Sequence, residues 1–318
     1  MSHPLQVSIL IITRDRREML GRLLGDLHKQ KYEGEFEIVV VEETDSPKAP
    51  DGVSYFSHPM RNKGIAFARN MALEHANHDL LVFVDDDCRV EPEWLSRLVA
   101  VFSDASVLGV QGGVTVPEET NAIGWAESLL GFPGGGVTRI HEAAGHVQNT
   151  LEISTLNAAY RKSAVQKVGG FPAEARFGGE DYILAKRVSE HGELQFVPDA
   201  AVQHEARGSV VAIWHWFVRR GRAEFELWRG GLAPEGFGAW MLRASLTMKL
   251  IPLVLLSFWT AWPLLGMIVL MAIINMWRYR WVLHESKIPN ASWWCLPWVR
   301  LLMGVATDFG RLRAWLKW

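Results

Sequence analysis

The first part of the chain alternates apolar runs with amphipathic segments. "VSILIIT" (7–13) and "FEIVVVEE" (36–43) are almost continuously apolar, which is typical of parallel strands that are covered on both faces. Between them, "RREMLGRLLGDLHKQ" (16–30) repeats apolar residues at intervals of three and four. That spacing predicts a helix with one apolar face.

The same alternation continues further along the chain. "NKGIAFARNMALEHAN" (62–77) predicts a loop that leads into a helix, "DLLVFVDDD" (79–87) a third strand, and "SVLGVQGGV" (106–114) another strand. This β-α-β-α-β order predicts an α/β fold with a doubly wound, mostly parallel central sheet. In such a sheet, ligands bind at the carboxyl ends of the strands.

The pattern changes in the last third of the chain. The 28 residues from Leu250 to Trp277 carry no charge, and as one helix they would measure about 42 Å, against about 30 Å for a hydrocarbon core. A buried helical pair is the soluble alternative. Because seven basic residues follow this run, we expect an apolar hairpin, about 250–277, bent near Pro263 to Gly266. Short arms would make the hairpin re-entrant, whereas a single pass is the alternative.

The basic, amphipathic stretch over about 291–318 predicts an interfacial helix. Charge divides the chain in the same way. The net charge is −2, but residues 1–210 hold 20 basic and 30 acidic side chains, whereas residues 211–318 hold 13 and 5. Of the 15 tryptophans, 13 follow residue 211. We therefore predict a catalytic domain over 1–230 and a C-terminal membrane-associated helical region over 231–318.

Other features narrow the class of protein. Long uncharged runs in the basic part argue against nucleic acid as a partner. Cys88 and Cys295 give neither a disulfide framework nor a zinc-type spacing. The opening "MSHPLQVSILIITRD" predicts a strand rather than a secretory signal. We therefore expect a protein of the cytoplasmic membrane whose catalytic domain faces the cytoplasm.

Polar side chains gather where the predicted strands end. Thr13 to Arg16 follow the first strand, Glu42 and Glu43 end the second, and Asp85 to Asp87 end the third. One acidic strand end is an ordinary turn, since Asp favours turns and helix caps. Several acids at one edge of a sheet would repel one another unless a cation or hydrogen-bond donors lay between them. We therefore predict a functional site at this edge, with a hard divalent cation.

Six motifs together resemble the family 2 glycosyltransferases of the GT-A fold. They are "TRDR", "VVVEETDS", "NKGIAFARN", "FVDDD", "LNAAYRKSAVQKVGGF" and "FGGEDYILAKRV". The resemblance covers residues 5 to about 230. It implies an inverting transfer of a sugar from a nucleotide-diphosphate sugar to a hydroxyl acceptor or a phosphate. It also implies Mg²⁺ or Mn²⁺ at the site, which neutralises the charge of the leaving diphosphate.

The resemblance assigns most of the donor and metal residues. Asp85 and Asp87 match the outer acids of the D-x-D motif, the first on the ribose side and the second as a metal ligand. Asp86 stands between them, and we include it among the donor-binding residues, although strand alternation should point it away from its neighbours. His204, in "FVPDAAVQHEA", matches a histidine that often completes the metal site. Its alternative role is that of an ordinary polar side chain.

Further residues are expected around the nucleotide sugar. Glu42 stands where the family usually has an Asp that binds the base, and this longer side chain leaves the identity of the base open. Thr13 and Asp15 would line the base pocket, and Arg69 matches an arginine that reaches the nucleotide.

Asp181 and Glu180 open a predicted helix after two glycines. By the resemblance they are the general base and an acceptor-positioning residue. The alternative is an ordinary helix start, since acids favour the first turn. The glycine-rich segment 131–138 could move over a bound substrate or be a long turn.

Arg220 and Arg222 would hold the diphosphate or meet lipid headgroups. A Q-x-x-R-W motif, as in processive synthases, is missing, which favours transfer of single sugars. Two alternatives stay open. A nucleotidyltransferase acting on sugar phosphates would need a glycine-rich phosphate loop after the first strand, and a catalytically dead membrane scaffold should have lost the acids. The membrane tail makes a lipid-linked glycan of the cell envelope a plausible acceptor.

Overall fold

The computed structural model describes residues 4–60, 63–173, 175, 178–232, 237–258 and 262–317. The chain divides into two compact units, which we call the sheet unit (Met1–Thr115 and Pro133–Glu205) and the helical unit (Val116–Phe132 and Ala206–Trp318). The predicted catalytic boundary near residue 230 stays a prediction, because close packing does not define where a catalytic function ends.

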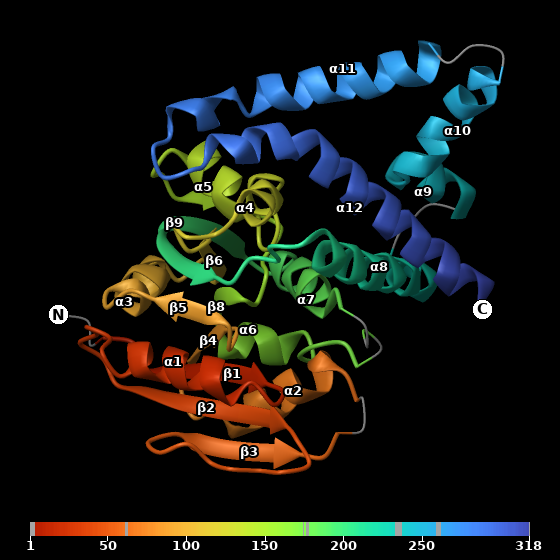
Figure 1. Ribbon diagram of the computed structural model, residues 1–318. Coiled ribbons are helices and arrows are strands. Elements are labelled where there is room, and N and C mark those ends of the chain that lie inside the picture. The colour runs from red at the N-terminus through yellow and green to blue at the C-terminus, as the bar shows by residue number, and fades with distance from the viewer. Residues whose placement is uncertain are drawn as a thin grey trace. The chain divides into compact units, whose positions relative to one another are not determined.

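The sheet unit is built on one nine-stranded mixed sheet (Figure 1). Its strands are β1 (Val7–Thr13), β2 (Phe36–Glu43), β3 (Ser54–His58), β4 (Leu80–Val84), β5 (Cys88–Val90), β6 (Val107–Thr115), β7 (Gln148–Asn149), β8 (Asn157–Arg161) and β9 (Glu193–His204). Their order is β3-β2-β1-β4-β8-β6-β9-β5, with β7 paired to β9. The predicted parallel arrangement is confirmed for β3-β2-β1-β4, and β6 and β9 are also parallel. The strand β8 runs antiparallel between β4 and β6.

Helices cover both faces of this sheet, as the continuous apolar strands predict. The helices are α1 (Arg17–Leu27), α2 (Ile65–His75), α3 (Trp94–Val99), α5 (Gly136–Ala143), α6 (Lys162–Lys167) and α7 (Glu180–Ser189). Successive strand residues alternate between two buried clusters. Ile9 and Ile11 pack with residues of α1 and α3, whereas Leu10 packs with residues of α2, α6 and α7.

The register of the parallel strands places their polar ends at one edge of the sheet. Thr13 at the end of β1 lies opposite Glu42 of β2, and Glu42 lies opposite Ser57 of β3. The glycine-rich segment 131–138 is only partly a loop, because Gly135 has a φ of 95° and α5 begins at Gly136.

Helices alone build the other unit. They are α4 (Ala122–Leu129), α8 (Val210–Leu227), the π-helical turn η2 (Trp228–Leu232), α9 (Phe237–Ala244), α10 (Leu246–Ser257), α11 (Trp262–Arg278), the 3₁₀ turn η3 (Arg280–His284) and α12 (Asn290–Leu316). The helix α12 packs against α8 and α4. At the crossing with α8, a Cβ atom on Gly221 would collide with the carbonyl of Thr307, and one on Gly310 with that of Val218. The two backbones therefore approach each other without intervening side chains.

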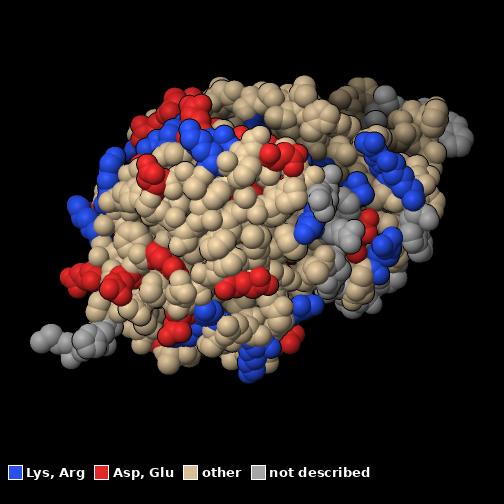
Figure 2. Space-filling view, turned by 90° about the horizontal axis from the view of Figure 1, so that it is seen from below, with Lys and Arg blue, Asp and Glu red and all other residues tan. Residues whose placement is uncertain are grey.

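Ion pairs tie the helical unit together. Arg311 is buried and donates to Glu224 of α8 and, at 2.8 Å, to Asp308 of its own helix. The second carboxylate oxygen of Asp308 accepts from the backbone N–H of Thr247 at 2.8 Å. Figure 2 shows a different feature, one face of the molecule on which acidic and basic side chains are interspersed in a mostly uncharged surface.

The uncharged run contributes to two helices, and the predicted hairpin over about 250–277 stays a prediction. The helix α10 ends at Ser257 and α11 begins at Trp262, so Pro263 and Gly266 lie within α11. Proline is tolerated at this position because the first turn of a helix needs no N–H donor from it. The predicted terminal helix corresponds to α12. Among the described residues, no helix combines the length and apolar character needed to cross a membrane.

Candidate active site

Three acids follow the buried strand β4 in the turn that leads to β5. The backbone N–H of Asp85 donates to the carbonyl of Leu156 at 3.3 Å, and that of Cys88 donates to the carbonyl of Asp85 at 3.1 Å. All five residues of β4 are buried, so the apolar strand holds the turn firmly at the edge of the sheet. This explains how a chain can keep three adjacent carboxylates together.

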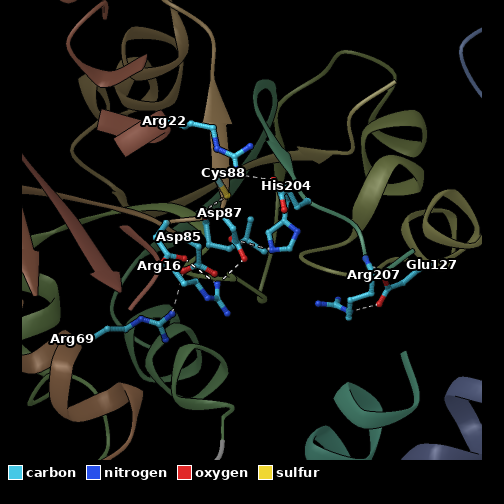
Figure 3. Close-up of polar contacts among 12 residues, drawn as sticks. Arg16, Arg22, Arg69, Asp85, Asp87, Cys88, Glu127, His204 and Arg207 are labelled. Carbon is cyan, nitrogen blue, oxygen red and sulfur yellow. Dashed lines mark hydrogen bonds and ion pairs between the residues drawn. The ribbon is translucent and has the colours of Figure 1, made fainter. Parts of the chain in front are cut away.

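A histidine from a distant strand meets two of these acids. His204 ends β9 and lies opposite Cys88 in the antiparallel pairing of β5 with β9. Its Nε2 atom is 3.3 Å from Oδ1 of Asp87, as Figure 3 shows. One ligand atom each from Asp85, Asp87 and His204 lies within 4.8 Å of the other two. The strand pairing therefore unites residues that are more than a hundred positions apart.

This group has the properties of a divalent cation site. Carboxylate oxygens and an imidazole nitrogen are ligands that Mn²⁺ and Mg²⁺ accept. Oδ1 of Asp87 is buried, and it has no hydrogen-bond partner within the described part of the chain. Because a buried carboxylate oxygen without a donor is costly, the residues present fit a bound cation.

Asp86 faces the end of β1. Its Oδ2 atom accepts a hydrogen bond of 2.6 Å from the hydroxyl of Thr13, and its Oδ1 atom lies 3.0 Å from Nη1 of Arg16. Burial raises the pKa of Asp86, and the donors Thr13 and Arg16 oppose that rise. Arg16 also reaches Asp87, so the middle acid stays linked to its neighbour instead of standing apart from it.

Arg69 lies between two of the predicted site acids. It is buried on α2, donates to Oε1 of Glu180, and places Nη2 at 3.7 Å from Oδ1 of Asp85. The second oxygen of Glu180 is buried and has no hydrogen-bond partner among the described residues. The arginine predicted to reach the nucleotide therefore joins the acids that follow β4 to the start of α7.

The environment favours the neutral form of two carboxyls. Desolvation raises the pKa of Asp85 to about 7, with the nearby acids adding to the rise and Arg69 opposing it. Because 38% of the Asp85 side chain is exposed, solvent reduces this effect. Desolvation also raises the pKa of Glu180 to about 7, and Asp181 adds to this effect while Arg69 opposes it. The guanidinium of Arg69 therefore does not cancel the rise in pKa that burial causes in either acid.

Asp181 is held at the start of α7. Gly179, which precedes the helix, has a φ of 84°, a conformation that a residue with a Cβ atom rarely adopts. Asp181 is half-buried, and its Oδ1 atom accepts the backbone N–H of Tyr182 at 2.8 Å. Among the described residues, no hydrogen bond reaches its other oxygen, which suits a general base.

The predicted base pocket has a buried acid. Glu42 is almost fully buried, its Oε2 atom accepts from the hydroxyl of Tyr55, and its Oε1 atom lies 3.7 Å from Nε of Arg17. Asp15 has a φ of 52° and accepts a hydrogen bond of 2.7 Å from Thr44. Tyr55, Arg17 and Arg16 were not predicted as site residues. For Arg16 there were two signals, its place directly after the first strand and the "TRDR" motif.

The remaining predicted residues lie in the helical unit. Arg220 is on α8, where it donates to Glu224 at 2.9 Å and stacks at 4.7 Å over the ring of Phe132. Arg222 is exposed on the same helix. Their roles in donor binding stay predictions.

Comparison with known proteins agrees with this fold. The chain aligns over 98% of its length, and 88% of the other chain, with the structure of mannosyltransferase PcManGT from Pyrobaculum calidifontis in complex with GDP-Man and Mn²⁺. The TM-score is 0.66 at 16% sequence identity, which establishes a shared GT-A fold. The model of the glycosyl transferase family 2 matches residues 8–169, about half of the chain. The protein belongs to this family and is a glycosyltransferase.

Two relatives come from Haloferax volcanii. Glycosyltransferase AglE is 26% identical over 240 residues, which cover 70% of this chain and 74% of the relative. A glucosyl-dolichyl phosphate glucuronosyltransferase is 22% identical over 192 residues, which cover 57% of this chain and 60% of the relative.

Proposed function

We propose that the enzyme transfers a sugar from a nucleotide-diphosphate sugar to an acceptor hydroxyl, with inversion at the anomeric carbon. The observation that carries this proposal is the placement of two kinds of acid. Asp85, Asp87 and His204 form a group suited to a divalent cation, whereas Asp181 comes from a separate helix start. An in-line displacement needs charge neutralisation on one side of the sugar and a base on the other.

The donor would be held at the carboxyl ends of β1, β2 and β4. Bound Mg²⁺ or Mn²⁺ would supply positive charge to the diphosphate as it departs, with Asp87 and His204 as protein ligands and Asp85 beside them. Glu42, with Thr13 and Asp15, would accept hydrogen bonds from the base. The structural relative in complex with GDP-Man and Mn²⁺ supports this class of donor.

Asp181 is our choice for the base. Asp85 and Asp87 are less suited, because a cation would occupy their lone pairs on the leaving-group side. Asp181 would take the proton of the acceptor hydroxyl as the new bond forms, a contribution of about 10²–10⁴-fold. Glu180 would then act through its contact with Arg69, and its ionised form would, as a like charge, favour proton uptake by Asp181.

A direct test measures the products of donor turnover. The purified chain would be incubated with a panel of nucleotide sugars, with and without Mn²⁺, and assayed for free nucleotide diphosphate and for pyrophosphate. Release of nucleotide diphosphate is expected, and Asp87→Ala should lack it. Release of pyrophosphate would favour the nucleotidyltransferase alternative, and protection against unfolding without any turnover would favour the dead scaffold.

We further propose that the helical unit lies on the cytoplasmic face of a membrane and that the acceptor is a lipid-linked glycan. Large apolar side chains are exposed along three of its helices, and surfaces of this kind usually contact a partner or a lipid. They are Ile251, Val254, Leu255, Leu256, Phe258, Trp262, Leu265, Val269, Leu270, Ile273, Ile274, Trp277, Trp294, Trp298, Phe309, Leu312, Trp315 and Leu316. The name of the dolichyl phosphate relative supports an acceptor of this class.

Since no described helix is both long and apolar enough to cross a bilayer, we expect interfacial or re-entrant helices. Labelling of intact cells tests the topology. A chain that carries Cys295→Ser and Lys317→Cys would leave Cys88, which is buried, as the only other thiol. An impermeant reagent should not label Cys at position 317 from outside. Labelling from outside would contradict the cytoplasmic orientation, and extraction of the protein by low salt alone would contradict the apolar contact.

A further inference from the structure

An arginine that the donor-site motifs do not assign holds two of the acids. Arg16 directly precedes α1. Its Nη1 atom lies 2.9 Å from Oδ2 of Asp87 and 3.0 Å from Oδ1 of Asp86, as the dashed lines of Figure 3 indicate for Asp87. About half of its side chain is exposed, whereas that of Asp86 is 4% exposed. The guanidinium therefore reaches from the surface into the acidic group.

The two oxygens of Asp87 have different partners. Oδ2 accepts the hydrogen bond from Arg16. Oδ1 lies beside Nε2 of His204 and has no hydrogen-bond donor in the described part of the chain. A carboxylate that is gripped through one oxygen cannot rotate freely. The contact with Arg16 therefore directs the other oxygen towards Asp85 and His204.

Arg16 is itself fixed from the other side. Asp86 accepts from Arg16 through Oδ1 and from the hydroxyl of Thr13 through Oδ2 at 2.6 Å. Thr13 is the last residue of β1 and is buried. The hydrogen bonds therefore form one continuous path from the rigid strand through Asp86 and Arg16 to Asp87.

We propose that Arg16 is a positioning residue for the divalent cation, which it serves by orienting Asp87. This inference rests on the cation site of the proposed function. Residues that hydrogen-bond to a metal ligand typically change metal affinity by about 10–100-fold when they are replaced. We expect an effect of this size, because no other described donor holds Asp87 Oδ2.

The positive charge of Arg16 lowers the affinity for a cation, whereas its hydrogen bond to Asp87 raises it. A guanidinium near the site repels a divalent cation, so a neutral replacement would remove the repulsion and the orientation together. Lysine keeps the positive charge but not the planar guanidinium, and its shorter overall reach draws the nitrogen back from the point where Nη1 of Arg16 meets both carboxylates. Arg16→Lys therefore isolates the positioning role.

The test is a titration of the full chain with Mn²⁺ alone, in which electron paramagnetic resonance reports the free ion. Arg16→Lys should bind Mn²⁺ about 10–100-fold more weakly than the wild type. Arg14→Lys is the matched control, because Arg14 lies two residues earlier, is similarly exposed, and faces Glu43 at 3.6 Å. This control should bind Mn²⁺ like the wild type. The melting temperature of the metal-free Arg16→Lys chain should stay close to that of the wild type.

A second variant tests the path from β1. Thr13→Val removes the hydroxyl without changing charge and should weaken Mn²⁺ binding by less than Arg16→Lys does. If both act through Asp87, the double variant should bind no more weakly than Arg16→Lys alone. Unchanged Mn²⁺ affinity in Arg16→Lys would overturn the role of Arg16 and leave the proposed function intact. A wild-type chain that binds no Mn²⁺ would instead contradict the proposed cation site.

Discussion

The sheet unit and the helical unit both bury charged side chains, but they compensate them differently. In the helical unit, Arg311 is shared between Glu224 and Asp308, and the remaining oxygen of Asp308 is taken by a backbone N–H. In the sheet unit, five acids stand around two arginines: Asp85, Asp86, Asp87, Glu180 and Asp181 around Arg16 and Arg69. Buried oxygens of Asp87 and Glu180 have no hydrogen-bond partner among the described residues.

This difference distinguishes a structural network from a binding site. Buried charges that are paired and hydrogen-bonded hold elements in place, and removing one partner costs stability. Buried charges left without compensation are unfavourable until a ligand supplies what is missing. The helical unit has the first kind of network, and the sheet unit has the second.

The largest expected effect is the loss of the cation ligand. Asp87→Ala should abolish transfer, because the group of Asp85, Asp87 and His204 loses a carboxylate whose Oδ1 atom is buried and lies beside His204. Donor affinity should also become insensitive to Mn²⁺ and Mg²⁺, which equilibrium binding with and without metal would measure. Asp51→Ala, at an exposed turn, is the control. Full wild-type activity in excess chelator would contradict metal dependence altogether.

Breaking the network of the helical unit should affect stability instead. Arg311→Met leaves Asp308 and Glu224 without their shared cation, a loss of about 3–5 kcal/mol in the free energy of unfolding. Tryptophan fluorescence in a urea titration would report it, since 13 of the 15 tryptophans follow residue 211. Arg313→Met, exposed on the same helix, should change little. Equal stability of both variants would mean that the pairing around Arg311 is not structural.

A smaller effect is expected from the base. Asp181→Asn should reduce transfer by at least about a hundredfold, equivalent to about 2.7 kcal/mol, while metal-dependent donor binding stays nearly intact. Single-turnover rates together with donor affinities would separate the two quantities. If transfer survives in this variant and is lost in Glu180→Gln, the two acids have the opposite roles. An acceptor that is already ionised, such as a phosphate, would make both substitutions nearly silent in the chemical step.

The smallest expected effect is a pH dependence of stability in the metal-free protein. Because the folded-state pKa of Glu180 is raised to about 7, its stabilising contribution is complete below the unfolded pKa, near 4.5. The contribution is lost as the pH rises to 7. Urea unfolding in chelator should therefore show stability falling between pH 4.5 and 7. Glu180→Gln should flatten part of this slope, since Asp85 contributes in the same range. Glu190→Gln, exposed on the next turn after α7, should leave the slope unchanged; a flat wild-type profile would contradict the raised pKa.

Features set by local pattern could be predicted from the sequence. Strands β1 and β2 were predicted residue for residue, because two-sided burial requires uninterrupted apolar runs such as "VSILIIT". The acidic edge followed from where those runs end. The short strand β3 was not predicted, since "SYFSH" is partly exposed and mixes polar with aromatic residues.

Contacts across long stretches of sequence could not be predicted in this way. Arg69 and Glu180 are 111 positions apart, and each resembles an ordinary surface residue on its own helix. Arg16 meets Asp86 and Asp87 only because β1 and β4 are neighbours in the sheet. The exact ends of α10 and α11 could not be predicted either, because a proline can stand in the first turn of a helix, as Pro263 does in α11.

The close crossing of α8 and α12 has a practical consequence for handling the protein. With glycines at the contact, the two helices meet backbone to backbone, and the apolar C-terminal segment is therefore not a detachable anchor. Ending the chain before Asn290 to gain solubility would remove α12, which would uncover Gly221 on α8 and leave Glu224 without Arg311. A soluble form is better sought by replacing exposed side chains such as Trp298 and Leu316 with polar ones, which leaves the glycines of the crossing unchanged.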